Sequence, residues 1–296
     1  MKISSFFKSH GCSVQLGTDL KCDLHYISVV FKKNLSLAMK ILSESKCDNV
    51  TIGGSGFSLL INLPDSIEYL KPDYSLYPDS DYSLGYTSRG CPRKCHFCVV
   101  PQKEGDFRIA QHPKEFHNDN FKKITLLDNN ILYNPDWFFE VTDFLLEKRL
   151  KVDFLSGLDI RYLTPEIADR LRILPKFKPL KFAFDDSSRF TTLKVFNGIH
   201  TLKESGINPR SCLFYVYVHD DLQLEDAVSR CNFIKKMGGT AFSMCNCDND
   251  LSSGMKYLKR YTRPWAFWSS DFGYVREGHD SFNCDDLFEK YSLVVP

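Results

Sequence analysis

The chain has 296 residues, 43% of them hydrophobic and 25% charged, which is typical of folded globular proteins and excludes an intrinsically disordered chain. Its 38 basic and 37 acidic side chains leave a formal net charge of +1, which argues against nucleic acid as a partner but leaves room for a local basic patch. The N-terminal MKISSFFKSHGC lacks the apolar core of a secretory signal, and no apolar run could span a membrane, so we expect a cytoplasmic protein with no membrane partner.

The first 81 residues have the pattern of a small α/β domain. A β-branched and aromatic segment at 25–31 predicts a strand, apolar residues at helical spacing follow over 34–43, and 49–52 predicts a second strand. Three glycines within 53–56, and a connector rich in Pro and Tyr over 63–81, then mark a domain boundary. We expect a shortened, Rossmann-like domain over 1–81.

From residue 82 onward, apolar strands alternate with amphipathic helices. This alternation predicts parallel βαβ units with the active site at the carboxyl ends of the strands. Six strands predict a partial (β/α)6 barrel over 82–260, and the aromatic-rich segment 261–296 is expected to pack over the barrel or its mouth. The predicted strands are 83–87, 123–127, 152–155, 180–184, 211–218 and 240–244, with helices at 135–148, 165–173, 193–203 and 224–236. Thr164 is expected to cap the helix that begins at Pro165.

Eleven cysteines are the unusual feature of the composition. Because a cytoplasmic protein keeps its thiols reduced, we expect metal ligands or buried apolar groups and no disulfides. Five cysteines stand singly and are expected to be buried, namely Cys12, Cys22, Cys47, Cys212 and Cys231.

Three further cysteines lie within eight residues, directly after the first predicted barrel strand. Cys91, Cys95 and Cys98 are spaced so that their thiolates can surround one soft metal centre, either an iron–sulfur cluster or zinc. A cluster of four irons held by three cysteines keeps one iron open, as a catalytic site requires. The alternative is structural zinc completed by His96 or by a distant cysteine, although the chain has no second Cys-x2-Cys pair.

The segment SRGCPRKCHFCVVP resembles the signature of the radical S-adenosylmethionine (SAM) superfamily, in the branch with cobalamin-binding domains and methylthiotransferases. The resemblance implies that the three cysteines bind a [4Fe-4S] cluster whose fourth iron is chelated by SAM. It also implies reductive cleavage of SAM to a 5′-deoxyadenosyl radical, which abstracts a hydrogen from the substrate, and an electron donor such as flavodoxin or ferredoxin. We also expect Phe97, the aromatic residue before the last cysteine, to be one of the cofactor-binding residues.

Polar residues that follow the predicted strands are candidates for contacts with SAM, each with a structural alternative. Asp128, Asn129 and Asn130 stand where the family often has a Gly-Gly-Glu-like segment, but they could form a simple turn. Ser156 or Asp159 could bind ribose and Arg161 a carboxylate, or Asp159 and Arg161 could pair only to order their loop. Asp185 could contact ribose, or cap a helix together with its neighbours.

Two other groups of residues leave alternatives open. The run up to Gly53-Gly54 is similar to part of a cobalamin-binding domain, but the chain lacks the Asp-x-His-x-x-Gly motif, so we expect no cobalamin there. Cys245 and Cys247, with Cys284 downstream, could bind a second cluster.

The leading hypothesis is a radical SAM enzyme that abstracts hydrogen from an unidentified substrate. One alternative is an RNA methylthiotransferase or methylase of the same superfamily. Another is a non-catalytic zinc or iron–sulfur scaffold.

Overall fold

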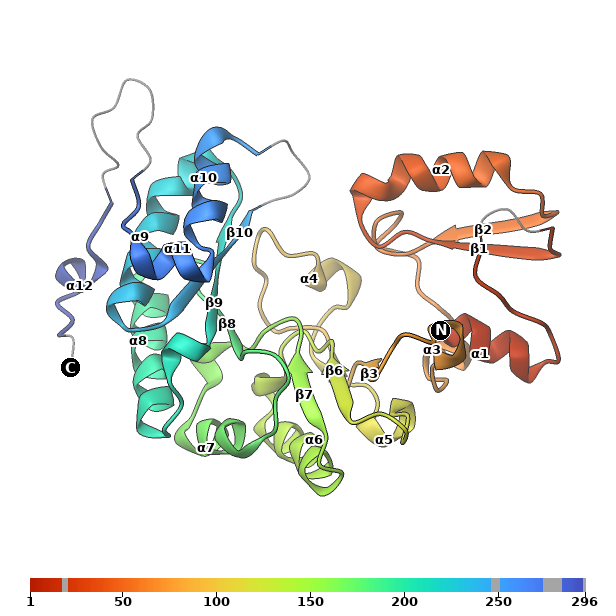
Figure 1. Cartoon of the computed structure of the whole chain (residues 1–296), viewed down its shortest axis with the longest axis horizontal. Coiled ribbons are helices and arrows are strands. Elements are labelled where there is room, and N and C mark those ends of the chain that lie inside the picture. Colours follow the sequence, from red (N-terminus) through yellow and green to blue (C-terminus); the bar gives the residue numbers. More distant parts are fainter. Residues whose placement is uncertain (18–20, 246–250, 274–283, 295–296) are drawn as a thin grey trace. The chain divides into compact units, whose positions relative to one another are not determined.

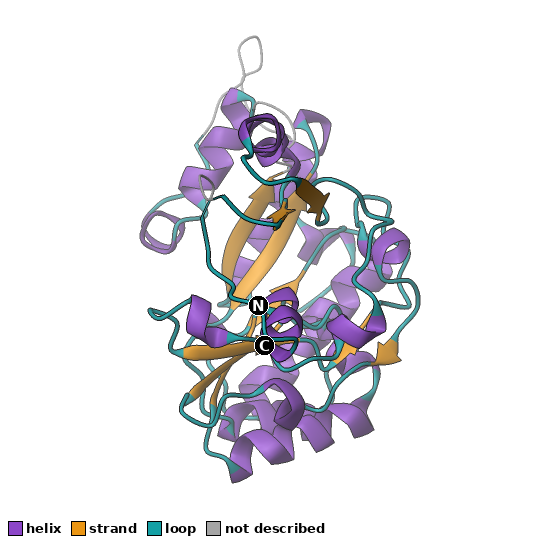
Figure 2. Ribbon diagram, turned by 90° about the vertical axis from the view of Figure 1, so that its right-hand side faces the viewer, coloured by secondary structure: helices purple, strands orange, loops and turns teal. Residues whose placement is uncertain are grey.

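The computed structural model describes residues 1–17, 21–245, 251–273 and 284–294, and the chain divides into two compact units, 1–122 and 123–296. Both units combine helices with parallel strands, so the predicted α/β class is confirmed (Figures 1 and 2). No helix in the described ranges is both long enough and apolar enough to cross a membrane.

The first unit contains the predicted strand–helix–strand. Strand β1 (Leu24–Ser28) pairs in parallel with β2 (Asn49–Gly53), and α2 (Leu35–Glu44) connects them. Ala38 on the helix is buried in one cluster with Ile27 and Val29. The other helices are α1 (Lys2–Ser9), α3 (Asp65–Glu68), α4 (Val100–Lys103) and α5 (Pro113–Phe116), and the other strands are β3 (Tyr82–Gly85), β4 (Ser88–Arg89) and β5 (Arg108–Ile109).

A disulfide joins Cys22 to Cys47, with the two Cα atoms 5.0 Å apart, so the expectation of no disulfides is wrong. The cause is strand register: β1 pairs with β2 at an offset of 25 residues, the same separation as between the two cysteines, and each cysteine lies two residues before its strand. Both are half-buried and Cys12 is exposed, so expected burial is also wrong for these three. Cys212 and Cys231 are buried as predicted.

The second unit is an alternation of parallel strands and helices. Strand β6 pairs with β7, β8 pairs with β9, and β9 pairs with β10, while an isolated parallel bridge between Leu158 and Phe182 joins the segment after β7 to β8. The strands are β6 (Lys123–Leu126), β7 (Lys151–Phe154), β8 (Lys181–Ala183), β9 (Leu213–Val218) and β10 (Thr240–Cys245), and the helices are α6 (Pro135–Glu147), α7 (Pro165–Ile173), α8 (Arg189–Glu204), α9 (Leu224–Lys236), α10 (Ser253–Tyr261), α11 (Pro264–Ser269) and α12 (Leu287–Lys290). As predicted, Thr164 caps α7 by accepting a hydrogen bond from the Ile167 N–H at 3.3 Å.

The strands of the second unit have one face under helices and one face lined by aromatic side chains. In β9, Phe214, Val216 and Val218 are fully buried, whereas the alternating Tyr215 and Tyr217 are half-buried. We call the surface that carries Tyr215 and Tyr217 the inner face. The next strand contributes Phe242, whose ring lies 5.7 Å from that of Tyr215.

Within the C-terminal segment, the region around Trp268 packs at the start of β10, whereas Phe288 of α12 stacks on Phe233 of α9. The indole Nε1 of Trp268 donates a hydrogen bond to the hydroxyl of Thr240, the first residue of β10, at 3.1 Å. The guanidinium of Arg210 lies 4.3 Å from the centre of the same indole. This end of the strand is opposite to the carboxyl edge at which an active site is expected.

Candidate functional site

The cysteine triplet lies on a loop between β4 and α4 in the first unit. The loop is held at its start by a hydrogen bond from the Cys91 N–H to the Gly105 carbonyl (3.1 Å), and it turns at its end through the Cys98 N–H and the Cys95 carbonyl (3.0 Å). Gly90 has a φ of 78°, and a Cβ there would overlap the Asp106 backbone, so only glycine allows this close approach. The sequence therefore fixes the base of the loop through its backbone.

Arg89, the last residue before this loop, is held in place by ion pairs. Its guanidinium forms ion pairs with Glu104, at 3.0 Å, and with Glu68, and it lies 4.0 Å from the centre of the Tyr86 ring. Burial alone would lower the pKa of Arg89, but the two carboxylates outweigh it and raise that pKa. Arg89 is therefore a fixed positive charge beside the triplet.

The donor chemistry of the triplet fits a three-thiolate cluster. Cys91, Cys95 and Cys98 are all half-buried thiols, and thiolates are the ligands that iron–sulfur clusters require. Within the described ranges, no three His, Cys, Asp or Glu side chains are arranged to hold a metal ion, so binding would require the thiols to converge. His96 is exposed, as a residue outside the ligand set would be, and its ring lies edge-on to half-buried Phe97.

Three of the residues expected to contact SAM form one polar group in the second unit. The carboxylate of Asp159 accepts hydrogen bonds from the Arg161 Nε at 2.7 Å and from the Asn130 Nδ2 at 3.2 Å, and it is also paired with a terminal nitrogen of Arg161. Asn130 follows β6 and Asp159 follows β7, so neighbouring strand ends are joined. The ion pair that the sequence left as an alternative is present, and it orders the 3₁₀ turn Ile160–Tyr162.

The turn that carries Arg161 depends on close packing by α8. Gly198 lies in the middle of this helix, and a Cβ there would overlap the Ile160 side chain. We expect Gly198→Ala to lower the free energy of unfolding by about 1–3 kcal/mol through overpacking, although alanine is the better helix former.

Urea unfolding measures this effect, with Asn197→Ala on the exposed side of the same helix as the matched control. The control should change stability by about 0.5 kcal/mol or less. A stabilised Gly198→Ala protein would show that the helix does not pack closely on the turn.

The remaining candidates lie close to strand ends but in different settings. Asp128 is buried, Asn129 is half-buried, and the exposed Ser156 donates a hydrogen bond to the Leu127 carbonyl at 3.0 Å. Half-buried Asp185 precedes a capping group in which Ser188 accepts a hydrogen bond from the Thr191 N–H.

The inner face carries residues that the sequence analysis did not single out. Asp153 on β7 and Lys181 on β8 form an ion pair whose side chains are only 5% and 9% exposed. Burial, and secondly the charge of Asp153, raise the pKa of Tyr215 nearby. Further along β9, the Tyr217 hydroxyl and His219 Nδ1 are 3.1 Å apart. The alternating aromatics in the run LFYVYV are the signal that could have revealed this face.

Of the three cysteines that could bind a second cluster, the structure describes two. Cys247 lies outside the described residues, Cys245 is buried, and Cys284 is half-buried. Burial raises the pKa of Cys284 to about 11, and the charge of Glu225 adds to this. A thiol with that pKa is protonated at neutral pH and is a poor metal ligand until the metal displaces its proton.

Two curated relatives indicate the family. A ribosomal protein uS12 methylthiotransferase, RimO, of Leptospira biflexa is 29% identical over 191 residues, which cover 56% of this chain and 37% of the relative. A tRNA-2-methylthio-N(6)-dimethylallyladenosine synthase of a Hydrogenobaculum species is 26% identical over 180 residues, covering 56% of this chain and 40% of the relative.

The match thus spans less than half the length of either relative, and no family model matches the chain. Both relatives are radical SAM methylthiotransferases, which use [4Fe-4S] clusters and SAM. The resemblance of this chain to the radical SAM superfamily, first indicated by Cys91-x3-Cys95-x2-Cys98, is therefore confirmed.

Proposed function

We propose that this protein is a radical SAM methylthiotransferase that acts on RNA. The observation that carries the proposal is the triplet of half-buried thiols in a chain whose relatives are methylthiotransferases. The comparisons favour this reading over the leading hypothesis from sequence, which was hydrogen abstraction from an unidentified substrate. The consecutive pairing of β6 with β7, and of β8 with β9 and β10, supports a partial (β/α)6 barrel over 82–260 as the fold of the site.

In this proposal, Cys91, Cys95 and Cys98 hold the cluster as thiolates. Bound together, the reduced cluster and SAM supply a 5′-deoxyadenosyl radical. The half-buried setting of the three sulfurs limits the access of water and oxygen to them. Arg89, fixed by Glu68 and Glu104, adds a positive charge at the start of the loop that carries them.

The polar group Asn130–Asp159–Arg161 is suited to orient a bound cofactor. Its three side chains restrain one another, so little conformational entropy remains to be lost when a ligand binds. A guanidinium held in this way can meet a carboxylate in a fixed direction. We therefore assign SAM positioning to this group, with Asp128, Asn129, Ser156 and Asp185 at the neighbouring strand ends.

The inner face supplies a surface on which a flat substrate could stack. Tyr217 and Met244 are cross-strand neighbours in β9 and β10, and the Met244 side chain is 44% exposed. Aromatic and thioether groups stack well on a nucleobase, which is how proteins commonly hold unpaired RNA bases. His219 beside Tyr217 adds a polar contact at the carboxyl edge.

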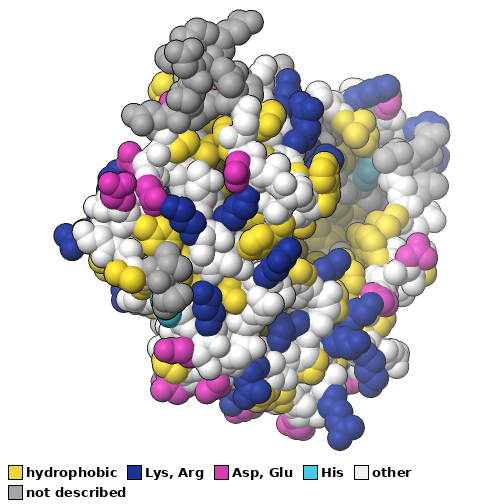
Figure 3. Space-filling model, turned by 60° about the vertical axis from the view of Figure 1, so that its left-hand side comes forward, with side chains coloured by type: hydrophobic (Ala, Val, Ile, Leu, Met, Phe, Trp, Pro, Cys, Tyr) yellow, Lys and Arg dark blue, Asp and Glu magenta, His cyan; other side chains and the backbone are white. Residues whose placement is uncertain are grey.

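The balanced net charge is compatible with RNA if cations gather locally. Figure 3 shows Lys and Arg side chains at many points of the face that it draws, with Asp and Glu side chains among them. One relative is named as a tRNA-modifying synthase and the other as a ribosomal-protein methylthiotransferase, so the substrate has to be tested directly.

The test is an anaerobic reaction of the iron- and sulfide-reconstituted protein with dithionite, SAM, added sulfide as the source of the transferred sulfur, and unmodified tRNA, followed by mass spectrometry of the digested nucleosides. We expect a nucleoside carrying an added methylthio group, formed only when SAM and reductant are both present. A parallel reaction with ribosomal protein uS12 separates the two substrate classes. Release of 5′-deoxyadenosine without any methylthio product on the RNA would exclude RNA methylthiolation.

A further inference from the structure

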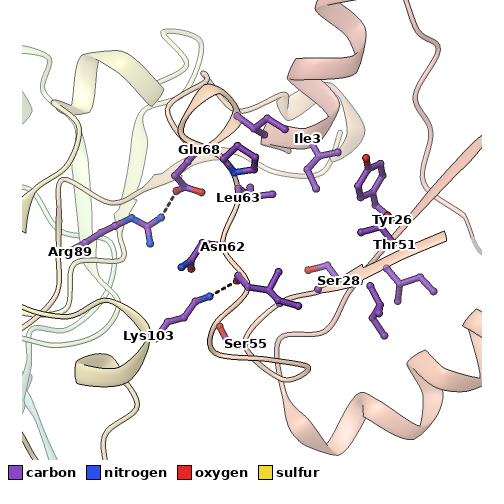
Figure 4. A pocket seen from close by; sticks show the side chains of 17 residues that line it. Ile3, Tyr26, Ser28, Thr51, Ser55, Asn62, Leu63, Glu68, Arg89 and Lys103 are labelled. Carbon is purple, nitrogen blue, oxygen red and sulfur yellow. Dashed lines mark hydrogen bonds and ion pairs between the residues drawn. The ribbon is translucent and has the colours of Figure 1, made fainter. Parts of the chain in front are cut away.

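A cavity of about 470 Å³ lies within the first unit at the carboxyl ends of β1 and β2 (Figure 4). Its volume is in the range of about 300–1,000 Å³ that small-molecule sites occupy. Ligands of parallel α/β sheets bind at this edge, because the connecting turns leave a crevice outside the strand ends. The residues that line this strand-edge cavity are separate from the triplet and from the SAM candidates of the second unit.

The turn after β2 shapes this cavity through two glycines. A Cβ on Gly54 would overlap the Val29 backbone, and one on Gly56 would lie 2.6 Å from the Phe31 carbonyl carbon. The two glycines therefore let the turn cross closely over the segment after β1, which explains them without a bound phosphate. Ser55 between them is exposed and lines the cavity.

The cavity has a different chemistry at each end. Figure 4 shows Arg89 and Lys103 on one side, Tyr26 and Thr51 on the other, and Ser28 and Ser55 between them. Most of the remaining wall is aliphatic, from Ile3, Ile52, Ile61, Leu63 and Ile67. The lining therefore offers an apolar end with an aromatic ring, hydroxyl groups in the middle, and a cationic end.

The neutral polar side chains that line the cavity are available to a ligand. Within the described part of the chain, the side chains of Ser28, Thr51, Ser55 and Asn62 make no hydrogen bond to protein. Three of them are hydroxyls and one is an amide, a set that can donate to and accept from a sugar.

The cationic end has more positive than negative charge. Glu68 is shared by Lys2 and Arg89, and Glu104 is shared by Arg89 and Arg108. Among the residues that the structure describes, Lys103 is held only by the Ile61 carbonyl, at 2.7 Å, and an ammonium has three donors. An anionic group beside Lys103 would balance this end.

We infer that the strand-edge cavity binds a nucleoside monophosphate, with the base at the apolar end, the ribose at the hydroxyl groups and the phosphate at Lys103. This inference does not depend on the proposed function, because no cluster or SAM is involved in it.

Calorimetric titration of the full chain with AMP, GMP, CMP and UMP tests the inference. At least one should bind about tenfold more tightly than both its nucleoside and inorganic phosphate, since the cavity recognises both parts together. Lys103→Met should lower the affinity for that nucleotide about tenfold and leave nucleoside binding unchanged. Ser55→Phe should fill the cavity and abolish binding of both.

The matched control is Lys40→Met, on the exposed side of α2 and outside the cavity, which should bind as the unmodified protein does. Circular dichroism reports whether Ser55→Phe folds, and the Lys103→Met comparison stands independently if it does not. Nucleotide affinity that neither Lys103→Met nor Ser55→Phe lowers would overturn the inference. The failure of all four nucleotides to bind would overturn it too, as would binding of hydroxocobalamin that Ser55→Phe abolishes.

Discussion

Replacing Cys95 by serine is expected to abolish binding of the iron–sulfur cluster. A serine hydroxyl is a hard donor that stays protonated at neutral pH, so two thiolates and one hydroxyl would remain where three soft ligands are needed. The backbone of the loop should be retained, because the hydrogen bonds from the Cys91 N–H to the Gly105 carbonyl and from the Cys98 N–H to the Cys95 carbonyl are made by main-chain groups that the substitution keeps. The loss should therefore come from the missing ligand and not from unfolding.

Iron and acid-labile sulfide content after anaerobic reconstitution measures this loss, together with the visible absorption of the cluster. The matched control is Cys12→Ser, since Cys12 is exposed and lies outside the triplet. We expect the Cys12 variant to hold as much iron and sulfide as the unmodified protein, and the Cys95 variant to hold neither above background. Equal iron content in both variants would remove Cys95 from the ligand set.

The largest effect on stability is expected at the buried ion pair of Asp153 and Lys181. Lys181→Met leaves the carboxylate of Asp153 buried without its partner, and breaking such a pair costs about 3–5 kcal/mol. The double variant Asp153→Leu/Lys181→Met should recover most of that loss, because two apolar side chains need no charge compensation.

Urea unfolding monitored by circular dichroism measures these differences. Lys290→Met is the matched control, since Lys290 pairs with Asp285 while both side chains remain about half exposed. This surface pair should contribute about 0–1 kcal/mol. If Lys181→Met were no more destabilising than Lys290→Met, the pair would have to be solvated rather than buried.

Local sequence patterns predicted the elements of the fold well. The predicted helices 165–173 and 224–236 agree with α7 and α9 at both ends, because Pro165 and the apolar spacing are local signals. Thr164 was identified as a cap for the same reason. The strands β4 and β5 were missed, since each has two residues and is defined only by its antiparallel partner.

Contacts between residues that are distant in the chain were harder to predict from the sequence. The Cys22–Cys47 disulfide depends on the register of two parallel strands, which no single cysteine position reveals. In the same way, Asp153 and Lys181 look like ordinary charged residues in sequence and become a buried pair only when β7 and β8 lie side by side.

The sequence located the loop of the candidate site but not the contacts between residues that are distant in the chain. The spacing of the triplet and its position after a strand are local, and both are seen in the structure. The joining of Asn130 to Asp159 was not foreseen, because it requires the ends of two strands to be adjacent. In the proposed function the substrate is recognised at the inner face, and the net charge of the whole chain is a poor guide to that local surface.

Release of 5′-deoxyadenosine is the most direct test of the central claim, that Cys91, Cys95 and Cys98 hold a cluster which cleaves SAM. The reconstituted protein, reduced with dithionite under anaerobic conditions and supplied with SAM, should form 5′-deoxyadenosine, and the Cys95→Ser protein should form none. Protein purified without oxygen that contains zinc instead of iron, or a fully loaded cluster that leaves SAM intact, would contradict the account.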